Sequence, residues 1–209
     1  QDTQDRQDTQ DPHAAGSDEK TLASSLARLF VGAVQPSLRV RVLGYGTLYV
    51  CPASDCYRTD FEIARVGEAL DAQRFILTAI SAGSSELTAN DMQERPLDEL
   101  LWAIGLHTAR ERQPGPAPRQ RLRSWPDFGR LAHDPRYLQA SAALSTAAMD
   151  RQELAAAAGL DEAQADRFLH ACQLCGLLET VADAAPAPSP AAAPSRGGLF
   201  DRLWRRLVK

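Results

Sequence analysis

The sequence predicts an α+β protein, in which a small α/β unit is followed by a three-helix, helix–turn–helix (winged-helix-like) module. Alternating apolar residues and turn glycines in the first half are typical of β-strands. Apolar residues in the second half recur with the period of an α-helix. A Pro/Gly segment, QPGPAPRQ, separates the two patterns and marks a boundary between them.

Residues 1–20 are polar and repetitive and contain no large apolar side chain, so we expect them to be disordered. The small α+β domain is expected over 21–112. Its predicted elements are a helix over 21–34, strands over 38–42, 47–51 and 74–81, and helices over 60–70 and 95–110. Gly44 and Gly46 supply the turn between the first two strands.

A hinge is predicted over 113–120, and the helix–turn–helix-like module over 121–181. Its expected helices are 135–147, 150–158 and 161–175, after an irregular segment held in place by Trp125 and Phe128. Gly159 lies between the last two helices, where a helix–turn–helix needs a residue that tolerates a positive φ.

The last of these helices raises the question of DNA binding, because a second helix of this kind lies in the major groove of DNA in many regulators. The side chains that we expect on its outer face are Asp161, Glu162, Gln164, Asp166, Arg167 and His170. Three of these six are acidic, and a duplex that carries one negative charge per about 1.7 Å would be repelled by them. The face is therefore predicted to bind a protein partner, and the alternative is a DNA-binding transcription regulator of the winged-helix type.

The C-terminal end has two further segments. Residues 182–198 form a Pro/Ala linker, and 199–209 form a basic amphipathic helix on this linker. We expect that helix to dock on an anionic membrane surface or on a partner, or to pack on its own domain. The docking residues are Leu199, Phe200, Arg202, Leu203, Trp204, Arg205, Arg206 and Leu207.

The four cysteines, Cys51, Cys56, Cys172 and Cys175, occur as a C-x₄-C and a C-x₂-C pair. A four-thiolate zinc site and a redox pair are alternatives, but buried cysteines most often act as small apolar groups. We therefore predict no metal and no cofactor. The sequence has no phosphate-binding loop and no nucleophile or zinc-protease motif, so no catalytic residue is proposed and the chain is not expected to be an enzyme.

No apolar run is long enough to span a bilayer, and the N-terminal segment does not begin as a secretory signal does. A cytoplasmic location is expected, with the C-terminal helix as a potential peripheral contact to the inner membrane.

Three runs carry a resemblance to a known family: RPLDELLWAIGLHTAR, LRSWPDFGRLAHDPRYLQASAALS and ELAAAAGLDEAQADRFLHACQLCGLLE. Over residues 37–180 the chain resembles an uncharacterised proteobacterial family whose members pair a small α/β region with a winged-helix-like module. That family is associated with Ras-like GTPases and roadblock-type regulators of surface motility. Because this sequence has no nucleotide-binding motif, the resemblance implies a signalling adaptor that is a partner of such a GTPase, not the GTPase itself.

Overall fold

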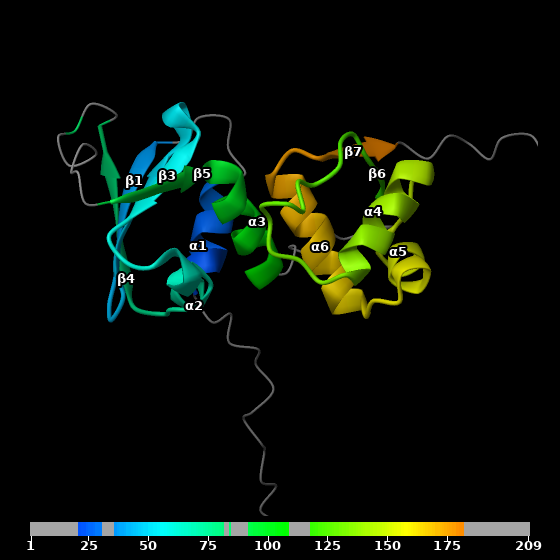
Figure 1. Ribbon diagram of the computed structural model, residues 1–209, viewed down its shortest axis with the longest axis horizontal. Helices are drawn as coiled ribbons and strands as arrows, with labels where there is room; N and C mark the ends of the chain where they lie inside the picture. The colour runs from blue at the N-terminus through cyan, green and yellow to red at the C-terminus, as the bar shows by residue number, and fades with distance from the viewer. Residues whose placement is uncertain (1–20, 31–35, 82–83, 85–91, 109–117, 182–209) are drawn as a thin grey trace, which may run out of the picture.

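The computed structural model describes residues 21–30, 36–81, 84, 92–108 and 118–181, which form a mixed α+β structure (Figure 1). The α+β class predicted from the sequence is confirmed at this level. Residues 199–209, with all the docking residues predicted there, lie outside the described part of the chain, as do 1–20 and 182–198.

The larger sheet has five antiparallel strands in the spatial order β4-β1-β2-β3-β5. Its strands are β1 (Ser37–Val42), β2 (Gly46–Cys51), β3 (Cys56–Thr59), β4 (Phe75–Ile80) and β5 (Gln93–Pro96). The three predicted strands are confirmed as β1, β2 and β4. The prediction missed β3, which has only four residues, and β5, whose QERP sequence has no apolar alternation.

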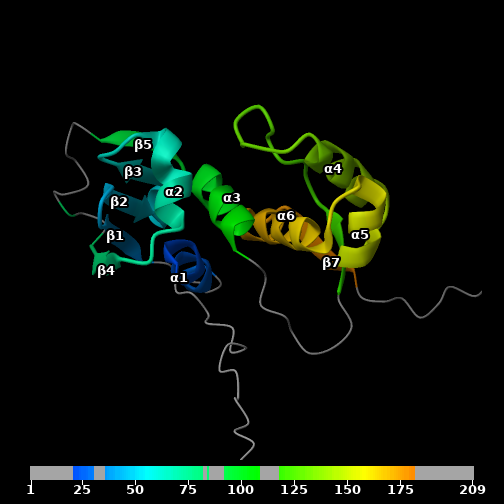
Figure 2. The same ribbon diagram turned by 90° about the horizontal axis from the view of Figure 1, so that it is seen from below.

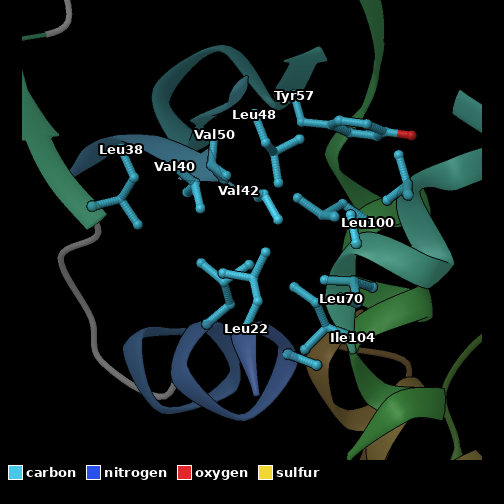
Figure 3. Close-up of a cluster of buried hydrophobic side chains, with 14 of the residues drawn as sticks. Leu22, Leu38, Val40, Val42, Leu48, Val50, Tyr57, Leu70, Leu100 and Ile104 are labelled. Atoms are coloured by element: carbon cyan, nitrogen blue, oxygen red, sulfur yellow. The ribbon is translucent and has the colours of Figure 1, made fainter. Parts of the chain in front are cut away.

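Three helices, α1 (Leu22–Leu29), α2 (Val66–Leu70) and α3 (Leu97–His107), lie on one face of this sheet (Figures 1 and 2). The predicted helix over 60–70 is confirmed only in its second half, because a 3-10 turn, η2 (Ile63–Arg65), precedes α2. A second 3-10 turn, η1 (Pro52–Ser54), joins β2 to β3. Strand and helix side chains meet in one apolar core, of which Figure 3 labels Leu22, Leu38, Val40, Val42, Leu48, Val50, Tyr57, Leu70, Leu100 and Ile104.

The remaining described residues form a small sheet and three helices. They are β6 (Arg119–Leu122), α4 (Arg136–Thr146), α5 (Arg151–Ala158), α6 (Glu162–Leu174) and β7 (Leu178–Val181). The three predicted helices are confirmed. Arg119 and Gln120 belong to β6, which pairs with β7, so the strand begins inside the segment predicted as a hinge.

Helix α3 packs against two parts of the molecule, because it touches the sheet core on one side and α6 on the other. The helix pair approaches most closely at Gly105: a Cβ there would lie 2.2 Å from the Ala171 Cα. Two backbones can approach so closely only where one of them has no side chain. Figures 1 and 2 show the resulting series of layers, from the sheet through α3 and α6 to α5.

Candidate partner-binding surface

The turn between α5 and α6 has the local chemistry that the sequence predicts. Gly159 is left-handed, with φ of 63°, and its N–H donates to the Ala155 carbonyl. Asp161 then begins α6 with a capping box: its carboxylate accepts from the Gln164 N–H at 2.7 Å, and the Gln164 side chain accepts from the Asp161 N–H. The orientation of α6 on α5 is therefore fixed by residues at its first turn.

Helix α6 is buried on two sides. On the side of α4 and α5, the ring centroids of Phe168 and Tyr137 are 5.0 Å apart. On the side of α3, the ring centroids of Phe168 and Trp102 are 5.9 Å apart. Trp102 is 1% exposed, and its indole N–H donates to the Ala132 carbonyl at 2.8 Å. A side chain from the first half of the chain thus contributes to the core of the helical module.

The expectation that His170 lies on the outer face of α6 was wrong. Its side chain is only 8% exposed, and its Nδ1 lies 2.9 Å from the Thr108 hydroxyl and 3.2 Å from the Thr108 carbonyl oxygen. The period of the helix places His170 in line with Asp166, but the end of α3 covers the side chain of His170. The sequence could not show this, because contact between α3 and α6 joins residues more than 60 positions apart.

The other predicted surface residues divide between two neighbours of α6. Glu162 points to α5, where its carboxylate lies 3.0 Å from the Arg151 guanidinium. Gln164 points to α4, where it accepts from the Arg136 guanidinium at 3.3 Å. Arg167 is exposed and Asp166 is half-buried. The structure therefore keeps Asp161, Gln164 and Arg167 near the start of α4 and directs Glu162 elsewhere.

The start of α4 adds residues to the candidate surface that were not predicted from the sequence. Asp134 and Arg136 form an ion pair at 2.7 Å, and hydrogen bonds from Arg136 hold the pKa of the Asp134 carboxyl down at about 2. Next to them, burial raises the pKa of the Tyr137 phenol, and the charge of Asp134 adds to the rise. We call the surface formed by Asp134, Arg136, Tyr137, Asp161, Gln164 and Arg167 the α4/α6 surface.

The charges of the α4/α6 surface have both signs and are held by hydrogen bonds within it. Besides its contacts with Asp134 and Gln164, the Arg136 guanidinium donates to the Gly159 carbonyl at 3.3 Å. The side chains of Asp134, Arg136, Asp161 and Gln164 are thus preorganised, since these hydrogen bonds restrict them before a partner arrives. The surface can form directional polar contacts with another protein.

The expectation that Trp125 holds the segment before α4 in place was wrong, because its side chain is 53% exposed. Other residues of that segment fix it: Phe128 packs on Trp102, and Arg130 donates to the Asp98 carboxylate of α3 at 2.7 Å. The SWPDF run could not tell which of its two aromatic side chains is buried. Trp125 is an exposed aromatic residue on a segment that its neighbours hold.

The cysteines lie in two separate places. Cys51 and Cys56 face each other across β2 and β3, whereas Cys172 is in the core of the helical module and Cys175 follows α6. Burial raises the pKa of Cys172 well above its usual value and that of Cys175 to about 12. These raised pKa values favour the protonated thiols at neutral pH, which is unfavourable for a nucleophilic role. Within the described ranges, no three His, Cys, Asp or Glu side chains are grouped as metal ligands.

Among the helices that the structure describes, none has the length and apolar character needed to cross a membrane. Comparisons with models of protein families, with curated proteins and with solved structures find no match for this chain.

Proposed function

We propose that this chain is a non-enzymatic adaptor that binds a protein partner through the α4/α6 surface. The observation that carries the proposal is the position of α6 between α3 and the α4–α5 pair. Because α3 packs against α6 at His170 and Ala171, the exposed face of this helix is interrupted there, with Glu162 and Arg167 exposed before the contact and Gln173 exposed after it. A recognition helix that lies along the major groove would present this face to DNA, and the contact with α3 interrupts it.

Charge also favours a protein partner over a duplex. Asp161 and Glu162, at the start of α6, would meet the phosphates or base edges if this helix entered a groove. On the α4/α6 surface, Arg136 is already paired with Asp134, so its charge is largely neutralised within the protein. A DNA-binding regulator, the alternative function, lacks support from either feature.

The resemblance described above gives the proposed adaptor a partner class, which is a small GTPase system. In this proposal the chain acts in the cytoplasm, and residues 199–209 dock it on a second surface, either an anionic membrane or another protein. The partner class and the role of residues 199–209 extend the adaptor function. If either proves wrong, the proposed adaptor function still stands.

Asp161 is unsuitable for a test of partner binding, because its side chain also caps α6. Replacing Asp161 by Lys would remove the cap of the helix, at a cost of about 1 kcal/mol, together with the charge. Arg167 avoids this difficulty, because it is exposed and is not part of the capping box. Arg123 is a matched control, since it is an exposed arginine of the same module outside the α4/α6 surface.

The experiment is affinity capture from the native cells with the full chain, Arg167→Ala and Arg123→Ala as baits, followed by titration of each captured protein against the purified variants. We expect a protein that binds the wild type and Arg123→Ala equally and binds Arg167→Ala about tenfold more weakly, as for a contact at the centre of an interface. Equal affinity of all three variants for every captured protein would contradict the proposed surface.

A further inference from the structure

Strands β4 and β5 lie at the two edges of the five-stranded sheet (Figure 2), and their sequences differ in chemistry. At one edge, β5 is short, ends in Pro96 and carries Glu94 and Arg95, which are the usual means by which proteins protect an edge strand. At the other edge, β4 has the sequence FILTAI, without a charge or a proline. Among the described residues, β4 pairs with β1 on one side only.

Strand β4 has the composition of a strand from the middle of a sheet. Phe75 and Leu77 face the helices and are incompletely buried, while Ile76 and Ile80 lie on the opposite face, where Ile76 is 56% exposed. An apolar edge strand without a charge or a proline has none of the usual means of preventing pairing with another chain. Another strand beside β4 would cover the exposed parts of these side chains.

The backbone of β4 can accept such a strand. The Leu43 N–H donates to the Arg74 carbonyl, so Arg74 faces β1. In an antiparallel pair the hydrogen-bonding direction alternates along the strand, and the N–H and C=O groups of Phe75, Leu77 and Ala79 therefore point away from β1. Three residues of β4 thus present their backbone donors and acceptors to the outer edge.

The sequence of β4 is self-complementary, so the strand that fits beside β4 is the β4 strand of a second copy of the chain. Around a two-fold axis at Leu77, Phe75 of one copy lies opposite Ala79 of the other and Ile76 lies opposite Thr78, and each pair is on one face of the sheet. All three outward-facing residues are then paired and no like charges meet. The same operation on β5 would place Glu94 opposite Glu94 or Arg95 opposite Arg95.

We propose that β4 is a homodimer interface, at which the strands of two copies of this chain pair antiparallel around a two-fold axis at Leu77 and join their sheets into one. Such an interface is isologous, because each copy contributes the same strand. It lies on the sheet, so it is independent of the α4/α6 surface and of the adaptor function.

Analytical ultracentrifugation of the full chain over a wide concentration range gives the first measurement. We expect a species of twice the chain mass of 22.7 kDa, in equilibrium with the monomer. Ala79→Pro tests the pairing, because it removes an N–H that points outward and leaves the hydrogen bonds to β1 in place. By symmetry two intermolecular hydrogen bonds are lost, and we expect dimerisation to weaken about tenfold or more.

Ile76→Lys is a second variant, and it should also weaken the dimer by placing a charge beside the pairing edge. Its matched control is Leu138→Lys, which makes the same change at an exposed apolar residue of α4, 42% exposed, and should leave the dimer unchanged. Circular dichroism establishes that each variant retains the fold of the wild type.

The register is tested by disulfide formation between copies. Leu77→Cys places two thiols opposite each other at the axis, with Cα atoms about 5.5 Å apart, within the range for a disulfide. Mild oxidation should join this variant into a covalent dimer much more than Thr78→Cys, which lies opposite Ile76. A wild type that is monomeric at every concentration, or a dimer that Ala79→Pro leaves intact, would overturn the proposal, and equal cross-linking of both cysteine variants would overturn the register.

Discussion

His170 shows how a single buried polar side chain connects the two halves of the chain. The Thr108 hydroxyl donates its hydrogen to the Ile104 carbonyl at 2.8 Å, so it accepts from the Nδ1–H of His170. The Thr108 carbonyl can only accept, and it lies 3.2 Å from the same nitrogen. The geometry therefore assigns the hydrogen of His170 to Nδ1, and the contact joins the end of α3 to the middle of α6.

At this scale we predict coupling between His170 and Thr108. His170→Ala and Thr108→Val should each lower the free energy of unfolding by about 1–3 kcal/mol, because each removes one hydrogen bond from a buried polar partner. Urea unfolding of both single variants and of the double variant measures the coupling. The double variant should be more stable than the sum of the two losses implies, whereas simple additivity would show that the contact does not form.

At the scale of the elements, the packing of α3 on α6 explains why Gly105 occupies a buried helical position. Leu100 and Ile104 of α3 point into the sheet core, while Trp102 points into the helical module, so the helix is apolar on two sides. Apolar periodicity predicts this helix over 95–110, but it does not show that Gly105 faces a second helix. A glycine inside a helix is unfavourable by about 1 kcal/mol relative to alanine, and the close contact with Ala171 gives the reason for it.

We predict that Gly105→Ala destabilises the protein although alanine is the better helix former. Its Cβ would lie 2.2 Å from the Ala171 Cα and 2.5 Å from the Ala171 backbone nitrogen, so the two helices would have to move apart. The expected loss is about 1–3 kcal/mol in thermal or urea unfolding. The control is Gly67→Ala, in the short helix α2, whose Cβ would lie 3.6 Å from its nearest neighbour, the His107 Nε2. A stabilising effect of Gly105→Ala would show that α3 and α6 do not approach as described.

At the scale of the whole molecule, local patterns predicted the elements and missed how they pack together. The helix from Arg136, the capped helix α6 and strands β1, β2 and β4 follow from apolar periodicity, capping residues and turn glycines, all of which act within a few positions. Strand β5 exists because it pairs with β3, which is distant in sequence, and β3 itself is a short strand between β2 and β5. For the same reason, the positions of Asp161 and Arg167 on the candidate surface could be predicted, whereas the burial of His170 and the participation of Arg136 could not.

The central proposal is that α6 faces a protein partner and not a duplex, because the contact with α3 interrupts its exposed face and its first turn is acidic. Fluorescence anisotropy of a labelled DNA duplex titrated with the purified full chain at low salt tests it most directly, because nonspecific binding is strongest under that condition. We predict that the helical module does not bind the duplex. The wild type and Arg167→Ala should therefore give the same anisotropy at every protein concentration. Salt-dependent binding that Arg167→Ala weakens would contradict the account, since it would place DNA on the start of α6.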